Sequence, residues 1–193
     1  MRGHVKDFVK RVAAIHPGLS VIEFGSMQVH ENSSADLRPL FPGREFLGTD
    51  MREGKGVDKV LNLHNIDLPD STYDIAICVD TLEHVEYPHK ALEEMERILK
   101  PGGIAIIASV MLFPIHDYPG DYFRYTPEGF GVLLKPFHKQ VVGQAGLDLY
   151  PHTVAGVGLK KGCEGYEKYV KLVQEWSLHT TKITDKRGKR RKT

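Results

Sequence analysis

Acidic residues and one asparagine stand at the ends of short apolar runs at four points in the chain. Glu23 lies in VIEFG, Asp50 ends LGTD, Asn62 lies in LNLHN and Asp80 ends CVD. Carboxylates and amides in such places can accept hydrogen bonds from a sugar hydroxyl or attract a cation. Gly25, directly after the first run, lets the backbone turn sharply and approach a ligand closely. We therefore expect one small-molecule site assembled from segments that are far apart in the sequence.

A second chemically dense segment, MLFPIHDYPGDYFRYTPEGF, covers residues 111–130. A loop this rich in aromatic, acidic and basic residues is typical of binding or catalysis. His116 is the leading candidate for a general base, because histidine titrates near neutrality, and His84 is the second. The groups that could orient a substrate are His116, Asp117, Asp121, Tyr122 and Arg124. The alternative is a packing role, with Tyr122, Phe123 and Tyr125 buried against a C-terminal helix.

The segment after Gly25 distinguishes between two classes of cofactor. A dinucleotide enzyme needs G-x-G-x-x-G, so that a pyrophosphate can rest on a helix N-terminus. Here the segment reads GSMQVH, with a single glycine, and Glu23 precedes it. An acid beside the ligand favours a cation over a phosphate. The sequence therefore argues against NAD.

Strand and helix patterns alternate along the part of the chain that carries these residues. Apolar runs predict strands at 19–24, 45–50, 57–63, 73–80 and 104–110, with helices at 3–16, 35–41 and 89–99. Such alternation predicts a parallel sheet with helices on both faces. Residues 126–134 are predicted to be helical, with Thr126 as N-cap. Two further runs, 139–144 and 153–159, have no long helix between them, which predicts an antiparallel strand at the end of the sheet.

The predicted organisation is a single domain over residues 1–182. It has an N-terminal helix at 3–16, a core at 19–161 and a C-terminal helix at 164–179. The last residues, 183–193, include KRGKRRKT and are expected to be a basic, flexible tail. This tail could contact nucleic acid, whereas the body of the chain is mildly acidic.

The composition is that of an ordinary globular protein, with 41% hydrophobic and 26% charged residues. No apolar run is long enough to span a bilayer, and the N-terminal residues lack the pattern of a signal peptide. Cys78 and Cys163 form no CxxC pair and no disulfide framework, so we expect a cytoplasmic setting. No cluster has metal-ligand spacing, so no metal is expected.

Taken in order, IEFGS, LGTD, DLPDSTYDIAICVDTLEHV and ALEEMERILKPGGIAIIAS resemble the class I S-adenosylmethionine (SAM)-dependent methyltransferases, in particular the type 11 methyltransferase domain family. The resemblance covers about residues 19–161 and is strongest at 68–109. It implies a Rossmann-like, doubly wound, mostly parallel seven-stranded sheet with an antiparallel last strand. It also implies SAM as the cofactor, whose cationic sulfonium suits a nearby acid.

The resemblance assigns roles residue by residue. The implied cofactor residues are Glu23, Gly25, Ser26, Asp50, Met51, Asn62, Leu63 and Asp80. The family usually has further glycines where Met27 and Gln28 stand, which leaves the role of the segment after Ser26 open. Each position also has a structural alternative. Asn62 could form a turn, Asp80 could cap the following helix, and Glu83–His84 could be a surface pair.

The reaction that this resemblance implies is an in-line methyl transfer, in which alignment and exclusion of water do most of the work. A small-molecule or sugar-like acceptor is favoured. The sequence has no N-P-P-Y-like run, which amino-methylating DNA and protein enzymes use to hold a planar nitrogen. Cys78 lies inside an apolar strand, so we do not expect a cysteine nucleophile that attacks a pyrimidine. Two alternatives remain: a nucleic-acid-directed methyltransferase that uses the basic tail, and a SAM-binding module without catalysis.

Overall fold

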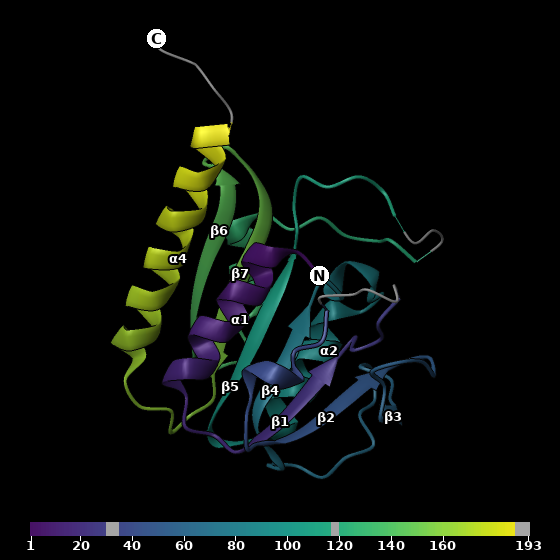
Figure 1. Cartoon of the computed structure of the whole chain (residues 1–193). Coiled ribbons are helices and arrows are strands. Elements are labelled where there is room, and N and C mark those ends of the chain that lie inside the picture. Colours follow the sequence, from purple (N-terminus) through teal and green to yellow (C-terminus); the bar gives the residue numbers. More distant parts are fainter. Residues whose placement is uncertain (30–34, 117–119, 188–193) are drawn as a thin grey trace.

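The computed structural model describes residues 1–29, 35–116 and 120–187, with side chains up to Thr180 in the last helix. Within these residues, seven strands form one sheet in the order β3-β2-β1-β4-β5-β7-β6 (Figure 1). The strands are β1 (Ser20–Phe24), β2 (Glu45–Asp50), β3 (Lys59–Val60), β4 (Tyr73–Val79), β5 (Leu99–Val110), β6 (Lys139–Leu147) and β7 (Tyr150–Leu159). Only β7, among the described strands, runs against its neighbours, β5 and β6. This is the mostly parallel sheet with an antiparallel last strand that the sequence predicts.

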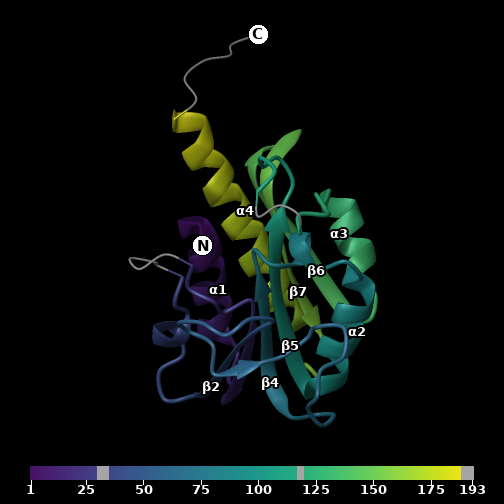
Figure 2. The ribbon, with the colours of Figure 1, turned by 90° about the vertical axis from the view of Figure 1, so that its right-hand side faces the viewer.

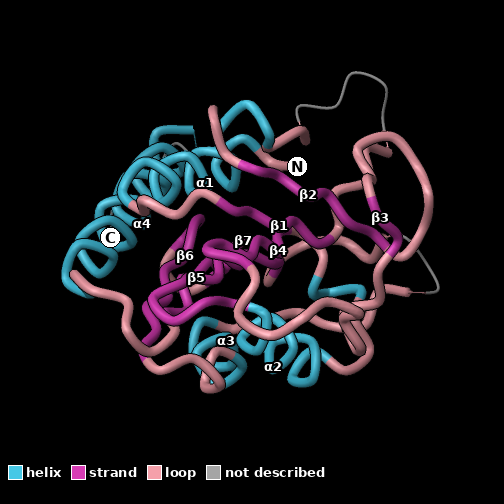
Figure 3. The backbone as a smooth tube through the Cα atoms, turned by 90° about the horizontal axis from the view of Figure 1, so that it is seen from below, coloured by secondary structure: helices cyan, strands magenta, loops and turns pink. Residues whose placement is uncertain are grey.

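Helices cover both faces of the sheet (Figures 2 and 3). α1 (Gly3–Ile15) and α4 (Tyr166–Arg187) lie on one face, and α2 (Pro88–Ile98) and α3 (Pro127–Leu133) lie on the other. Two short 3-10 helices, η1 (Arg38–Leu40) and η2 (Leu82–His84), lie in the connections that follow β1 and β4. No helix in the described part of the chain is long and apolar enough to cross a membrane.

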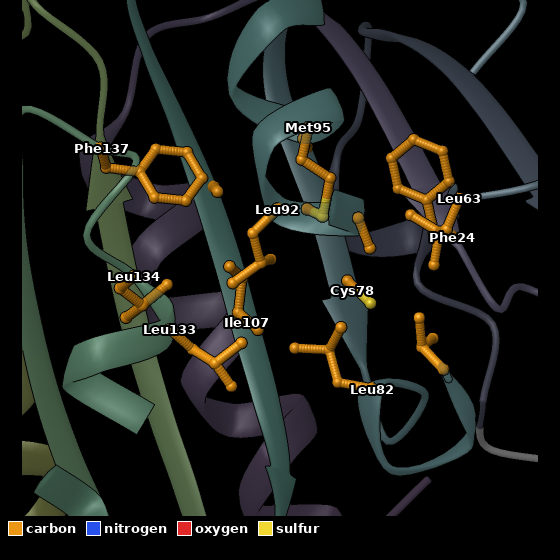
Figure 4. Close-up of a cluster of buried hydrophobic side chains, with 14 of the residues drawn as sticks. Phe24, Leu63, Cys78, Leu82, Leu92, Met95, Ile107, Leu133, Leu134 and Phe137 are labelled. Carbon is orange, nitrogen blue, oxygen red and sulfur yellow. The ribbon is translucent and has the colours of Figure 1, made fainter. Parts of the chain in front are cut away.

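The central strands are buried on both faces, which explains their continuous apolar runs. Alternate side chains supply two cores. Figure 4 shows the core under α2 and α3, which includes Leu82, Leu92 and Ile107. The other core lies under α1 and α4, where the rings of Phe8 and Trp176 pack with centroids 4.8 Å apart. Nε1 of Trp176 also donates a hydrogen bond to the backbone carbonyl of His4, at 3.0 Å, so α1 and α4 form one layer.

Local signals placed most element boundaries correctly. The N-cap at Thr126 is confirmed, because its Oγ1 accepts a hydrogen bond from the Gly129 amide at 3.1 Å. Three expectations need correction. The helix predicted at 35–41 is only the 3-10 helix η1, since Pro42 disfavours helical backbone at the residue before it. The strand predicted at 57–63 pairs only at β3, because Leu61 and Leu63 turn into the core under α2 and α3.

The third correction concerns the C-terminus. α4 ends at Arg187 rather than at residue 179, so the predicted tail at 183–193 begins in a helix. Residues 180–187 contain no glycine or proline, and their lysines and arginine favour helical backbone. The rest of the predicted tail, 188–193, lies outside the described residues.

Candidate functional site

The predicted cofactor residues gather at one edge of the sheet because their strands are parallel neighbours. Phe24 of β1 pairs with Thr49 of β2 on one side and with Cys78 of β4 on the other. The strand order reverses between β1 and β4, which is where open α/β sheets bind ligands. The residues brought to this edge are Glu23, Gly25, Ser26, Asp50 and Asp80. We refer to this edge as the strand-end crevice.

The backbone conformation at position 25 requires glycine. Its φ is 78°, in the left-handed region that favours glycine, and a Cβ here would collide with the hydroxyl of Thr81. The amides of Gly25 and Ser26 both donate to the Thr49 carbonyl, at 2.8 and 3.0 Å. The turn after β1 is therefore held firmly at the edge of the crevice.

The segment after Gly25 packs against the loop that follows β2. The buried Ser26 donates its hydroxyl to the Gly56 carbonyl at 2.9 Å, and the Gln28 amide donates to the Lys55 carbonyl at 2.8 Å. Because its hydroxyl is held in this way, Ser26 would contact a ligand through its backbone.

Glu23 is a buried acid beside the turn. Its exposed fraction is 4%, and burial raises the pKa of its carboxyl to about 8. Arg38 and Lys6 act in the opposite direction, whereas Asp36 adds to the rise. A cation arriving at this edge would favour the ionised form of Glu23, which suits a positively charged ligand better than a phosphate.

Asp50, at the end of β2, keeps hydrogen-bonding capacity. Its Oδ1 accepts the Arg52 amide at 3.1 Å, and its side chain is 14% exposed. Within the described residues, no hydrogen bond is recorded for its other oxygen, Oδ2. Met51 follows with 65% exposure, so its side chain is available to lie against a ligand.

Asn62 and Leu63 occupy the turn that follows β3. Oδ1 of the exposed Asn62 accepts the His64 amide at 2.9 Å, which is the turn-forming role that the sequence left open. The side-chain amide can still donate to a ligand. Leu63 is buried in the core under α2 and α3, so its side chain supports the turn from below.

Asp80, which follows β4, has φ of 50° and does not act as a helix cap. Its Oδ1 lies 2.5 Å from Nη2 of Arg2, the residue before α1. Arg2 also donates to Thr153 Oγ1 and to the His152 carbonyl on β7. Nothing in the local sequence marks Arg2 as part of the site, because its partners are 78 to 151 positions away.

The described residues between β5 and α3 are hydrogen-bonded to η2 rather than packed on α4. The amides of Tyr122 and Phe123 both donate to the Glu83 carbonyl, at 2.8 and 3.2 Å. The buried Tyr125 donates its hydroxyl to the Leu82 carbonyl at 3.0 Å. Packing against the C-terminal helix, the alternative for Phe123 and Tyr125, is thus corrected: both join the core under α2 and α3. We call residues 111–125 the acceptor segment.

Asp121 and Arg124 brace this segment. The carboxylate of Asp121 receives two hydrogen bonds of 2.6 Å from Arg124, and it accepts the His116 amide at 2.9 Å. Its side chain is only 1% exposed, and these bonds hold the pKa of the carboxyl well below its usual range. Asp121 therefore positions the segment and is less suited to touching a substrate. Tyr122 is 51% exposed, and Asp117 lies outside the described residues.

The two candidate bases meet each other. Nε2 of His84 lies 3.1 Å from Nε2 of His116. The Nδ1 atoms point at backbone carbonyls, that of His84 at Gly120 and that of His116 at Pro114, at 2.7 and 3.1 Å. A carbonyl can only accept, so each Nδ1 donates. The sequence suggested the two histidines separately and gave no sign that they form a pair.

The alternative in which Glu83 is half of a surface pair is wrong. Its exposed fraction is 1%, and its Oε2 accepts a hydrogen bond from the Ser109 hydroxyl at 2.6 Å. Burial raises the pKa of its carboxyl. Its other oxygen, Oε1, is buried and has no hydrogen-bond partner in the described part of the molecule. A buried, half-paired carboxylate beside two histidines is the feature of the site that sequence reasoning missed.

Comparison with known proteins shows which enzymes the chain is similar to. Residues 44–107 match the family model described as a methyltransferase domain. The chain is 25% identical over 189 residues to the ubiquinone/menaquinone biosynthesis C-methyltransferase UbiE of Ralstonia pickettii, covering 79% of this chain and 77% of that protein. It is 43% identical over 60 residues to the probable methyltransferase ltbC of Aspergillus luteorubrus, covering 30% of this chain and 20% of the fungal protein.

Among solved structures, the chain is similar to a Thermotoga maritima protein described as a SAM-dependent methyltransferase, possible histamine N-methyltransferase. The TM-score is 0.58 at 24% identity, covering 81% of this chain and 92% of that one. The matched family segment, the relatives and the sheet order support a class I SAM-dependent methyltransferase. They support the family and SAM as the cofactor, and the sheet confirms the fold, as the sequence predicted.

The strand-end crevice fits SAM on its own chemistry. SAM is cationic at its sulfonium and its amino group and carries ribose hydroxyls, and the crevice offers carboxylates from Glu23, Asp50 and Asp80. Gly25 brings the backbone close, and Asp50 has an oxygen that can accept from a ribose hydroxyl.

Proposed function

We propose that this protein transfers a methyl group from SAM to a small-molecule or sugar-like acceptor held between the strand-end crevice and the acceptor segment. One observation carries the proposal. The acceptor segment is anchored to the Glu83 carbonyl on η2, only three residues after Asp80 of the crevice. Cofactor residues and acceptor residues therefore lie beside one another, as a direct transfer requires.

The cofactor residues would divide the work. Asp50 would bind the ribose, Asn62 and Leu63 the adenine, and Glu23, Gly25, Ser26 and Asp80 the methionine part, with Met51 against the ring. When bound, SAM supplies a methyl group on a leaving group that is already activated. The protein then has to orient the acceptor and keep water away.

The acceptor segment would both orient the acceptor and keep water away. Tyr122 and the histidine pair present polar groups, and Phe113 adds an aromatic edge against His116, with ring centroids 5.1 Å apart. For a hydroxyl acceptor, His116 is the candidate to take the proton, with His84 beside it. Arg124 and Asp121 would hold His116 in place through the amide contact described above. Because Cys78 and Cys163 are both free thiols, we also propose a cytoplasmic setting.

The test is a screen for S-adenosylhomocysteine formation with pooled metabolites, glycans and RNA as separate arms. The proposal expects turnover in the metabolite or glycan arm. Turnover only with RNA would instead support the nucleic-acid alternative, and SAM binding without turnover in any arm would support a binding module.

Removal of residues 188–193 serves as a matched control in this screen. The small-molecule proposal expects turnover and SAM affinity to stay unchanged. If the RNA arm is the active one, removal of these residues should flatten the dependence of RNA binding on salt, because fewer phosphate contacts would be made.

A further inference from the structure

Three groups with metal-ligand chemistry converge where the acceptor segment crosses η2. Glu83 and His84 come from η2, and His116 comes from the acceptor segment. One ligand atom from each lies within 4.8 Å of the other two. Two imidazoles and one carboxylate are a ligand set that zinc and other first-row transition ions accept.

The carboxylate supplies an independent sign of a ligand. Glu83 is 1% exposed, and Ser109 holds only its Oε2. Oε1 is buried without a hydrogen-bond partner among the described residues. Buried polar atoms normally have partners, so an unpaired oxygen on a carboxylate that lies beside two histidines points to a missing positive group.

The histidine pair leads to the same conclusion. With each Nδ1 donating to a carbonyl, the two Nε2 atoms face each other at 3.1 Å. Two lone pairs cannot face each other at this distance unless a proton or a metal ion lies between them. Metal–nitrogen bonds of about 2.0–2.1 Å place neighbouring ligand nitrogens about 2.9 Å apart in octahedral geometry and about 3.4 Å apart in tetrahedral geometry. The observed separation falls between these values.

The outer contacts of all three groups also match those of metal ligands. Metal-binding histidines typically donate their second ring N–H to a carbonyl or carboxylate, which fixes the tautomer and the orientation of the ring. His84 does so to Gly120, and His116 does so to Pro114. The Ser109 hydroxyl orients the carboxylate of Glu83 in the same way.

We propose that Oε1 of Glu83, Nε2 of His84 and Nε2 of His116 bind one divalent first-row transition-metal ion, of which Zn²⁺ is the representative. This replaces our sequence-based expectation of no metal. Three protein ligands leave a coordination position open, as in catalytic zinc sites. With the ion bound, Nε2 of His116 is a ligand and not the proton acceptor proposed above, and the ion itself would act on an acceptor oxygen as a Lewis acid. The binding proposal itself does not depend on which acceptor is used.

The test uses the full chain without a polyhistidine tag, stripped with a chelator and titrated with ZnCl₂ by calorimetry. Co²⁺ replaces Zn²⁺ in a second titration followed by visible absorption. We expect one tightly bound ion per chain and cobalt d–d bands that show nitrogen and oxygen ligation. Glu83→Gln and His116→Gln should each weaken binding at least about tenfold, since even outer contacts of metal sites contribute this much.

The chain offers a matched control in a second histidine pair. His4 and His152 have ring centroids 4.7 Å apart, the same separation as His84 and His116, but they lie beside the cationic Arg2. His152→Gln should therefore leave the stoichiometry and the affinity unchanged. Thermal melting of each variant checks folding, and the change at the half-buried His116, His116→Gln, covers the case in which Glu83→Gln does not fold. Failure of the wild-type chain to bind one equivalent overturns the proposal. Equal binding by folded His116→Gln does so as well.

Discussion

Nη2 of Arg2 lies 2.5 Å from Oδ1 of Asp80, which joins the start of α1 to the end of β4. The guanidinium also lies 5.4 Å from the ring centroid of Phe113 in the acceptor segment. One side chain thus contacts the cofactor crevice and the acceptor segment. In the proposed cofactor site, the positive charge of Arg2 would offset the negative charge of Asp80 beside the cationic cofactor.

Arg2→Ala should strengthen binding of SAM relative to S-adenosylhomocysteine, because only SAM carries the sulfonium charge. Removal of one positive charge a few ångströms away is worth roughly a threefold change in this ratio at a solvated site. Calorimetry with both ligands measures the ratio. Arg11→Ala, on α1 and paired with Asp7 at the surface, should not change it. An unchanged ratio in Arg2→Ala would show that the charge of Asp80 has no effect on the binding of the sulfonium.

Asp50→Ala should weaken SAM binding tenfold or more, because the loss of charge-assisted hydrogen bonds costs roughly 1.5–3 kcal/mol. Asp67→Ala, an exposed acid beyond β3, serves as the control for the change in net charge. Equal affinities of the two variants for SAM would remove Asp50 from the cofactor site.

The raised pKa of Glu23 predicts how stability depends on pH. In the unfolded chain this carboxyl ionises near 4.5, whereas in the folded protein its pKa is about 8. Between these values the folded state holds a proton that the unfolded state has lost, so stability falls as pH rises toward 8. His4, His16 and His152, whose folded pKa values are lowered, act in the opposite direction until their unfolded forms, with a pKa of 6.5, have lost their protons, so the window from about pH 7.5 to 8.5 isolates Glu23 best.

Urea unfolding of the ligand-free protein across that window measures the slope. Wild type should lose stability as pH rises, and Glu23→Gln should flatten the slope because it cannot ionise. Glu83, whose pKa is also raised, is present in both proteins and cancels in the comparison. Parallel slopes would mean that Glu23 is ionised in the folded state.

Substitution in the acceptor segment should separate turnover from cofactor affinity. His116→Ala should lower turnover by about a hundredfold if it handles the acceptor proton, with SAM affinity nearly unchanged. Asp121→Ala should lower turnover as well, because Arg124 and the His116 amide lose their common partner. Glu128→Ala, exposed on α3, is the control. A primary loss of SAM affinity in His116→Ala would place this histidine in the cofactor site.

The sheet could be predicted from sequence because burial leaves a local record in apolar runs. The strands at β1, β4 and β5 are buried on both faces, and their composition shows it directly. The acids at the ends of β1, β2 and β4 follow from the same reading, since parallel strands finish at one edge. Local pattern was therefore sufficient for the fold and for placing these acids at one edge of the sheet.

The acceptor side could not be predicted in the same way, because its contacts join residues that are distant in sequence. Glu83 accepts a hydrogen bond from Ser109, which is 26 positions away in the sequence. Nε2 of His84 contacts Nε2 of His116, which is 32 positions away. A glutamate next to a histidine in the sequence is typical of an exposed surface. Here the contacts between the acceptor segment and η2 place the two residues in a site instead. Arg2 is a similar case, because an arginine near the N-terminus carries no local sign of a partner on β4.

The hydrogen bond from Trp176 to His4 spans 172 positions and has a consequence for the order of folding. Closing so long a loop costs entropy, so we expect the layer of α1 and α4 to complete after the sheet that it covers has formed. A nascent chain would hold one face of its sheet open until α4 had been synthesised. Trp176 is the only tryptophan in the chain, and it is buried against Phe8. The change in its intrinsic fluorescence during refolding should therefore report the time course of that final docking step.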